Sequence, residues 1–460
     1  MKQIRLEQNA FQGNAPVMAV FPDDWDVSTY PLPCDAWPAL SAEKIRQRIR
    51  QPIGMLPLSE LAKGKEKVCI VFDDITRGTP TQQMAEAVLE ELLAAGVAKQ
   101  SIRFLCALGT HGAHSLKDHI DKLGERIVHE YPIYNHNCYE NCISVGTTRR
   151  GFDVRINAEF MKCDLRIGLG AVVPHTMNGF GGGSKMIIPG IAHIDTIAHN
   201  HETATAFLNR NHLNSSEMTG DLAISGMREE IEEMARMAGP FFKVDCIYNS
   251  RLELVDLYAG DPVEEYYAAI PAAKRAYAIE RFAPADVVLV NVNAKATEAT
   301  IATGLGAMCL KPGGDVVVVD MTCRGQATHY LFGAFGRETG GRMMGGMPSV
   351  RPKVDRYICW MPHPDLGAAH WFGEIDKQIY VDTWEEVLRL LKEKHKTSIR
   401  VAVVTEATLA YFRQENGDAD VSSDRQREKD TNIYHTAGGK ADVSDVRRGT
   451  ADVYSVQRER

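Results

Sequence analysis

Six short apolar runs, each followed by polar or glycine-containing sequence, are the feature that most restricts the fold of this chain. They are Val68–Phe72, Ile102–Leu108, Leu165–Val173, Val287–Val292, Val316–Val319 and Ile399–Val404. Runs without polar alternation are typical of strands that are buried on both faces, as in parallel sheets. Between the first two runs, Thr81–Ala95 carries apolar residues at helical spacing and is followed by Gly96, a favourable residue after a helix. A strand, a helix and a second strand predict a βαβ unit, so we expect an α/β protein.

The same pattern returns later in the chain, which predicts two α/β domains with mainly parallel sheets and an active site in the cleft between them. We expect three parts: an N-terminal cofactor-binding and catalytic domain (1–270), a C-terminal α/β domain (271–415) and a tail (416–460). The sequence also predicts a helix at Met227–Met237, a loop at Asp256–Pro262 and a turn at Lys311–Gly314. The tail has no apolar periodicity. We expect it to be disordered, because it offers too little apolar surface to offset the entropy of ordering.

Composition and charge exclude several classes of protein. The net charge of −8 argues against a nucleic-acid-binding surface, which usually needs a basic face. No apolar run approaches the ~20 residues that cross a bilayer, and Met1–Pro16 lacks the order of a secretory signal. The ten cysteines form no CxxC pair, and we expect most of them to be buried, reduced thiols. These features predict a cytoplasmic protein that binds neither nucleic acid nor membrane, and they leave its oligomeric state open.

Polar clusters follow the first two predicted strands, at the edge where α/β sheets bind ligands. In the sequence DDITRG (residues 73–78), a carboxylate, a hydroxyl and an arginine could hold a carboxylate or a phosphate. A helix N-cap followed by a turn explains the same residues equally well. The second strand ends in GTHG, so His111 lies beside a strand end, where it could act as a general base or a metal ligand. Taken singly, a loop histidine more often has no such role.

The longest glycine-rich cluster follows the third predicted strand. Residues 174–190 read PHTMNGFGGGSKMIIPG, and their glycines allow the backbone to approach a ligand closely. The stretch GGGSK is similar to a phosphate-binding loop, but it lacks the GxxxxGK[ST] spacing. Pro189 and Gly190 follow Lys185 within five residues, where such a loop would need a helix. We therefore reject an ATPase interpretation.

Two histidines follow this cluster, His199 and His201, in the sequence IDTIAHNH. On a strand this spacing places both side chains on one face, whereas on a helix it does not. No HExxH or Cys/His finger spacing accompanies them, so a single metal bond from one of them is favoured over a joint zinc site. The remaining histidines, including His329 and His370, are expected to be surface or structural residues.

The clusters together are more specific than any one of them. DDITRG, LGTHG, PHTMNGFGGGSK and a histidine sixteen residues after that lysine resemble the lactate racemase family. The stretches PIGMLPLSELAKGKEKVCIVFDD, MREEIEEMARMAGPFF and LYAGDPVEE agree with it. The resemblance covers roughly residues 15–410 and is strongest over 50–265. It implies an isomerase, a racemase or epimerase of a small 2-hydroxy acid.

The resemblance also implies a cofactor, the nickel-pincer nucleotide, a pyridinium-3,5-bisthiocarboxylic acid mononucleotide that carries nickel. Separate cofactor-synthesis enzymes would have to supply it. By motif, Lys185 would hold the nucleotide covalently and His201 would supply a nickel ligand. Asp74 and Thr76 would bind the cofactor, with Thr76 near its phosphate.

For catalysis, the resemblance implies that hydride passes from C2 of the 2-hydroxy acid to the cofactor and returns to the other face of the planar 2-keto acid. His111 and His175 would be the acid/base pair, one for each hand of the substrate. Arg77 and Lys295 would bind the substrate, with Arg77 anchoring its carboxylate.

Departures from the family leave the substrate open. The second cluster lacks the arginine that lactate enzymes carry after its histidine, and Gly78 replaces a proline. Where those enzymes use a Gln and a Lys to contact substrate, this chain offers Lys295 and Glu298 but no Gln. A sugar acid or a dicarboxylate is as well supported as lactate. Two other hypotheses are a different hydride-shuttling reaction on the same cofactor and an inactive binding or sensor homologue.

Overall fold

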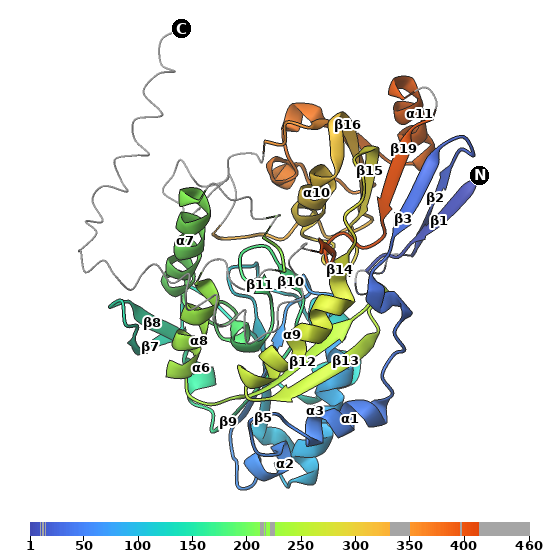
Figure 1. Cartoon of the computed structure of the whole chain (residues 1–460). Coiled ribbons are helices and arrows are strands. Elements are labelled where there is room, and N and C mark those ends of the chain that lie inside the picture. The colour runs from blue at the N-terminus through green and yellow to red at the C-terminus, as the bar shows by residue number, and fades with distance from the viewer. Residues whose placement is uncertain are drawn as a thin grey trace.

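Two six-stranded, mainly parallel sheets organise the computed structural model of the chain (Figure 1). The first has the strand order β13-β12-β9-β4-β5-β6, and the second has the order β18-β17-β16-β15-β19-β3. The predicted α/β fold with two mainly parallel sheets is confirmed. The structure describes residues 1–9, 11, 13, 15–211, 216, 218–220, 226–331, 350–395 and 398–413. The tail predicted over 416–460 lies outside the described residues.

Three of the predicted strands lie side by side in the first sheet. Its members are β4 (Val68–Asp73), β5 (Ile102–Ala107), β6 (Ile133–Asn135), β9 (Leu165–Ala171), β12 (Phe242–Tyr248) and β13 (Leu254–Gly260). Neighbouring strands are parallel, apart from the antiparallel pair β12 and β13 at one edge. The carboxyl ends of β4, β5 and β9 therefore meet at one edge of this sheet.

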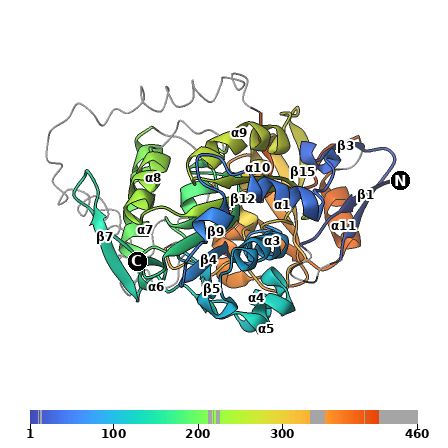
Figure 2. The same cartoon turned by 90° about the horizontal axis from the view of Figure 1, so that it is seen from below.

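Helices cover both faces of the first sheet. Its flanking helices are α1 (Ala42–Arg50), α3 (Thr81–Ala94), α7 (Ile194–Arg210), α8 (Met227–Met237) and α9 (Glu264–Tyr277). Along β4, Ile70 and Phe72 join a hydrophobic cluster with α1 and α3, whereas Cys69 and Val71 join a second cluster with α8. This alternation follows from the two-residue period of a strand. Figure 2 shows α7 and α8 on one side of β9, and α1 and α3 on the other.

The second sheet is wholly parallel in its described pairings. Its members are β3 (Asp26–Tyr30), β15 (Ala285–Asn291), β16 (Leu310–Val319), β17 (Val354–Trp360), β18 (Gln378–Val381) and β19 (Arg400–Val404), flanked by α10 (Ala299–Met308) and α11 (Trp384–Lys394). Strand β3 pairs with β19, so residues 26–30 belong to this sheet although they fall inside the predicted 1–270 domain. The domain limits stay a prediction.

Smaller elements complete the described fold. They are β1 (Lys2–Leu6), β2 (Val17–Phe21), α2 (Leu58–Leu61), α4 (Leu116–Leu123), α5 (Glu125–Glu130), β7 (Cys142–Thr147), β8 (Asp153–Asn157), α6 (Ala158–Met161), β10 (Pro174–His175), β11 (Gly179–Phe180), β14 (Ala278–Ile279) and β20 (Tyr411–Phe412). The hairpin β1–β2 packs against α11 beside the second sheet.

Two local predictions are wrong. The loop expected over Asp256–Pro262 is mostly strand β13, because Asp256 is half-buried at the sheet edge and the residues beside it are buried. The turn expected over Lys311–Gly314 lies inside β16. The two glycines still make this strand irregular. Gly313 has φ +77°, and the pairing register of β16 with β17 shifts just after Gly314. The predicted helix at Met227–Met237 is confirmed as α8.

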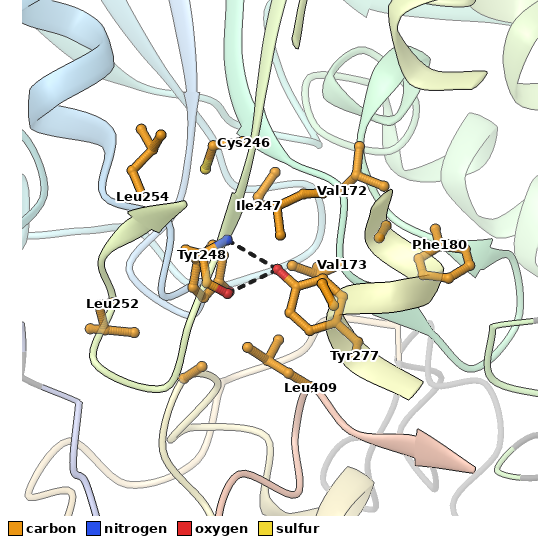
Figure 3. Close-up of a cluster of buried hydrophobic side chains, with 14 of the residues drawn as sticks. Val172, Val173, Phe180, Cys246, Ile247, Tyr248, Leu252, Leu254, Tyr277 and Leu409 are labelled. Atoms are coloured by element: carbon orange, nitrogen blue, oxygen red, sulfur yellow. Dashed lines mark hydrogen bonds between the residues drawn. The ribbon is translucent and has the colours of Figure 1, made fainter. Parts of the chain in front are cut away.

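A buried cluster joins the two halves of the chain beneath the ends of β9 and β12 (Figure 3). In it, the Tyr277 hydroxyl donates to the carbonyl of Tyr248 (3.0 Å) and accepts from its amide (3.1 Å). Leu409, which follows β19, packs in the same cluster as Val172 and Val173, which follow β9. One core therefore fixes the strand ends from which the loops of both sheets emerge.

The cysteines agree with the expectation of mostly buried, reduced thiols. None of the ten forms a disulfide; eight are buried, Cys142 is half-buried and Cys323 is exposed. Among the described residues, no helix combines the length and the apolar character that crossing a membrane requires.

Candidate active site

The loops that follow β4, β5 and β9 face loops of the second sheet around a cavity of about 410 Å³. Seven of the eight predicted site residues line it: Asp74, Arg77, His111, His175, Lys185, His201 and Lys295. The eighth, Thr76, is buried in the loop after β4, and its hydroxyl donates to Asp74. The fold thus brings together side chains that are more than 200 residues apart in sequence.

A carboxylate holds His111 from one side. Nδ1 of His111 lies 2.5 Å from Oδ2 of Asp74, and Oδ1 of Asp74 accepts from the Thr76 amide (3.1 Å). Burial alone would raise the pKa of Asp74, but the charges of His111 and Arg77 outweigh burial and hold that pKa well below its usual value. Because the carboxylate is ionised, Nδ1 of His111 carries a proton, and neutral His111 has its lone pair on Nε2.

His175 has the opposite arrangement. It ends β10, which pairs with β11, and its Nδ1 accepts the amide of Met177 (3.1 Å). Burial lowers the pKa of His175 well below its usual value, and the positive charges of Lys295 and Arg77 lower it further. His175 is therefore neutral with its proton on Nε2, the nitrogen that lies 3.3 Å from Nζ of Lys185.

Lys185 lies in a short 3-10 helix (Gly183–Met186) rather than at the start of an α-helix. Burial lowers its pKa well below the usual value, and the charges of Arg228, Arg77 and Lys295 lower it further. A lowered pKa increases the share of the neutral amine, which is the nucleophilic form of a lysine.

Buried charged groups support the loop that carries Lys185. Asp245 accepts the amide of Gly183 (2.5 Å) and pairs with Lys243 (2.5 Å), and both side chains are fully buried. Arg228 donates to the carbonyl of Gly182 (3.1 Å). Lys243 and Asp245 also line the cavity and were not predicted from the sequence. Two opposite charges on one face of an otherwise apolar strand were the pattern that could have indicated them.

The loop tolerates no side chain at Gly183. This residue has φ +57°, and a Cβ there would lie 2.6 Å from the carbonyl oxygen of Pro262. We expect Gly183→Ala to lower the free energy of unfolding by about 2 kcal/mol or more, since strain of about 1–2 kcal/mol adds to the displacement of the loop. Gly151→Ala is the control, because Gly151 has φ +81° with nothing within 4 Å of its Cβ position. Equal losses in denaturant unfolding of the two variants would contradict the role given to this close approach.

The helix α7 separates the two histidines of the IDTIAHNH sequence. His199 stacks on Phe152 with ring centroids 4.0 Å apart and lies 3.2 Å from Glu230, outside the cavity. His201 lines the cavity, and its Nδ1 donates to the carbonyl of Ile197 (2.9 Å), which leaves the lone pair on Nε2. Among the described residues, no group of three or more His, Cys, Asp or Glu could hold a metal ion by itself.

The second sheet supplies the opposite wall. Glu298 Oε1 lies 2.9 Å from Nη1 of Arg77, so this ion pair connects the two halves across the cavity wall. Lys295 donates to the carbonyl of Pro174 (3.0 Å). Burial, followed by the charge of Arg77, lowers the pKa of Lys295 to about 8, so this lysine is mainly protonated at pH 7.

Two histidines expected to be surface or structural residues also line the cavity, His329 and His370, and Trp371 lies beside them. The His329 ring lies 5.2 Å from that of His111, and burial lowers the pKa of His329 well below its usual value. His329 lies after β16, and His370 and Trp371 lie after β17, several residues beyond the strand ends. They belong to no recognisable motif, so only the order of the parallel strands could have suggested their position.

Comparison with known proteins gives one family. Residues 13–213 match the lactate racemase N-terminal domain. The chain is similar to the lactate racemase of Thermoanaerobacterium thermosaccharolyticum, with 26% identity over 249 residues, which cover 54% of this chain and 57% of that protein. It is also similar to the lactate racemase of Lactiplantibacillus plantarum, with 29% identity over 221 residues, or 48% and 50% of the two chains. The aligned part thus spans about half the length of these curated relatives.

Solved structures share the fold over a longer stretch. The lactate racemase apoprotein of T. thermosaccharolyticum superimposes with a TM-score of 0.67 and 18% identity, covering 90% of this chain and all of that one. A Thermotoga maritima protein solved by structural genomics gives a TM-score of 0.58 and 18% identity over 81% of this chain and 98% of that chain. At this identity the likeness establishes the fold alone.

Proposed function

Since this chain is a distant member of the lactate racemase family, we propose that it is an isomerase, a racemase or epimerase of a 2-hydroxy acid, that works with a nickel-pincer nucleotide. The observation that carries the proposal is a pair of histidines in opposite tautomers on one cavity, beside a lysine whose pKa burial lowers. A reaction that inverts C2 in both directions needs one group that accepts the hydroxyl proton of one enantiomer and a second group that does the same for the other enantiomer.

The two histidines would divide the proton chemistry. Nε2 of His111 would accept the proton of the substrate hydroxyl, because Asp74 holds the proton of the neutral ring on Nδ1 and stabilises the charged ring that forms. Nε2 of His175 would donate a hydrogen bond to the oxygen on the other side. To transfer a proton there, this ring would first have to take up a second proton from solvent, because a neutral imidazole that lost its only N–H would become an imidazolate. For the other enantiomer of the substrate the two histidines exchange roles. Each histidine then returns to its starting protonation state by exchanging a proton with solvent.

The residues present fit the proposed cofactor. Lys185 offers an amine whose lowered pKa favours the nucleophilic form for a covalent bond. His201 offers an Nε2 lone pair that the Nδ1 hydrogen bond orients, as is usual for a metal-bound histidine. Both line the cavity that holds His111 and His175. When bound, the nucleotide would supply the acceptor and donor for the hydrogen on C2.

Two cations, Arg77 and Lys295, lie on the same cavity and would attract the carboxylate of the substrate. A carboxylate held at a fixed point orients C2 between the two histidines, which reduces the entropy cost of reaction. Thr76 would act indirectly, because its hydroxyl oxygen accepts from Arg77 (2.8 Å).

The test is inversion of a single enantiomer labelled with deuterium at C2. Protein produced alongside the cofactor-synthesis enzymes should convert one hand of a 2-hydroxy acid to the other, and the product should retain the C2 deuterium in ordinary water. Chiral chromatography with mass spectrometry measures both. Loss of the label to solvent would contradict hydride transfer, and no inversion of any 2-hydroxy acid by fully loaded protein would contradict the function.

A further inference from the structure

We propose that Glu265 is a positioning residue for Lys185: a buried, neutral carboxylic acid that donates its proton to Asp245 and thereby holds the loop that carries the lysine. Glu265 lies in the first turn of α9 and is not among the residues that line the cavity. The inference rests on the proposed function only where it takes Lys185 to be the point of cofactor attachment.

The Glu265 side chain is fully buried and receives no hydrogen bond from the described residues. The residue is 0% exposed, and no N–H or O–H group donates to either of its carboxyl oxygens. A second carboxyl group, that of Asp245, lies within hydrogen-bonding reach of it. Two carboxyl groups can share a hydrogen bond only if one of them holds a proton, so one member of this pair is a neutral acid.

Asp245 is the member of the pair that stays ionised. Its oxygens accept from the Gly183 amide and from Nζ of Lys243, each at 2.5 Å, and both donors favour a negative charge. Burial and the charge of Asp245 raise the pKa of Glu265 well above its usual value, and they outweigh the charges of Lys243 and Arg228. The N-terminus of α9 also favours an ionised glutamate, but by less than the cost of burying a charge without a hydrogen bond. Glu265 therefore holds the proton.

Only two hydrogen bonds separate Glu265 from the backbone of the Lys185 loop. Asp245 accepts the amide of Gly183, the first residue of the short 3-10 helix that contains Lys185. Helix α9 packs on β12 (Figure 1), and its first turn also meets this loop, since a Cβ on Gly183 would lie 2.9 Å from Cβ of Tyr266. The acid gives Asp245 a third donor, which fixes the carboxylate that the Gly183 amide contacts.

The neutral state of Glu265 also suits the charge around the lysine. Lys243 and Asp245 neutralise each other, and Gly170 leaves the space for them, since a Cβ there would lie 3.1 Å from Lys243 Nζ and from Asp245 Oδ1. An ionised Glu265 would add an unbalanced negative charge near Lys185. Such a charge raises the pKa of a lysine and reduces the share of its nucleophilic form. A neutral acid supplies the hydrogen bond without this effect.

Two substitutions of Glu265 in the full-length chain test the inference. Glu265→Gln keeps the volume and the neutral state and supplies an N–H donor for Asp245, whereas Glu265→Leu keeps a similar volume and removes the donor. Infrared difference spectroscopy at pH 7 should show the C=O band of one protonated carboxylic acid in the unaltered chain that is absent from Glu265→Gln.

A second measurement follows Lys185 on protein without the cofactor. Acylation of Lys185 by acetic anhydride, mapped by peptide mass spectrometry across pH, should have the same midpoint in the unaltered chain and in Glu265→Gln. In Glu265→Leu the loop is released toward solvent, so the midpoint should rise by about one pH unit, a tenfold loss of the neutral amine. Produced alongside the cofactor-synthesis enzymes, Glu265→Leu should also acquire the Lys185 adduct about tenfold more slowly.

Glu264→Leu is the matched control, because Glu264 lies in the same turn of α9 but is exposed. It should change neither the infrared band nor the acylation of Lys185. Equal effects of the two leucine variants would show that only the charge at the end of α9 matters, and would overturn the inference.

Three other outcomes would also overturn the inference. They are an unaltered chain without the band of a protonated acid, an unchanged acylation midpoint in Glu265→Leu, and a loss in folded Glu265→Gln as large as that in Glu265→Leu. If Glu265→Leu does not fold, the infrared band and the acylation of Glu265→Gln decide. Absence of an adduct on Lys185 in the unaltered chain would contradict the proposed cofactor, whereas the band and the acylation midpoints would still test the role of Glu265.

Discussion

Lys185→Ala protein, produced alongside the cofactor-synthesis enzymes, should be purified without a covalent adduct and without stoichiometric nickel. The unaltered chain should carry an adduct on Lys185 and about one nickel per chain. The reason is the lowered pKa of Lys185, which gives it a larger share of the neutral, nucleophilic amine than an exposed lysine has. Without the covalent bond, His201 alone would be too weak a ligand to hold the metal. Intact-protein mass and metal analysis measure both quantities, and inversion should fall to background.

Lys295→Ala is the matched control for this experiment. Lys295 is a second lysine of the same cavity, is buried, and has a pKa lowered to about 8 by burial and by Arg77. Its removal should leave the adduct on Lys185 in place. An adduct that maps to another lysine, or an unmodified chain beside a loaded lactate racemase from the same cells, would contradict the proposed attachment.

The sequence was sufficient to predict how the site assembles, for a physical reason. DDITRG, GTHG and the glycine-rich cluster each follow an uninterrupted apolar run, and parallel strands place their carboxyl ends together. The motifs around Asp74, His111 and Lys185 therefore had to meet if the runs formed one sheet. His201 was less certain from the sequence, because its position depends on whether residues 194–201 are helix or strand.

Other parts of the site could not be predicted from local sequence. The Arg77–Glu298 pair joins loops of two different sheets, so it depends on how the sheets are placed. Strand β3 pairs with β19 across 374 positions, measured from Asp26 to Arg400, and no pattern within either strand indicates this. The ion pair of Lys243 and Asp245 lies in β12, a strand whose residues are all buried. Its place in the site could not be predicted, because tertiary contacts decide whether an ion pair is buried.

Asp74→Asn should lower the rate of inversion by about 10²–10⁴-fold without removing the adduct on Lys185. Its carboxylate lies against Nδ1 of His111, whereas the amide of an asparagine can donate to that nitrogen and move the ring proton to Nε2. His111 would then face the substrate as a donor, and the pair would have two donors and no base. For a racemisation the equilibrium constant is one, so the rates in both directions should fall together.

The matched control is Asp73→Asn in the same loop. Asp73 contacts Lys122 (2.9 Å) and the hydroxyl of Thr79 (2.5 Å) rather than His111, so its removal disturbs the loop without changing the proton position on the histidine. ¹⁵N NMR of histidine-labelled protein distinguishes the two cases: the His111 proton should be on Nδ1 in the unaltered chain and in Asp73→Asn, and on Nε2 in Asp74→Asn. A loss of activity in Asp74→Asn with the proton still on Nδ1 would show that Asp74 supports the loop and does not set the base. Full activity with the proton moved to Nε2 would remove His111 from the acid/base pair.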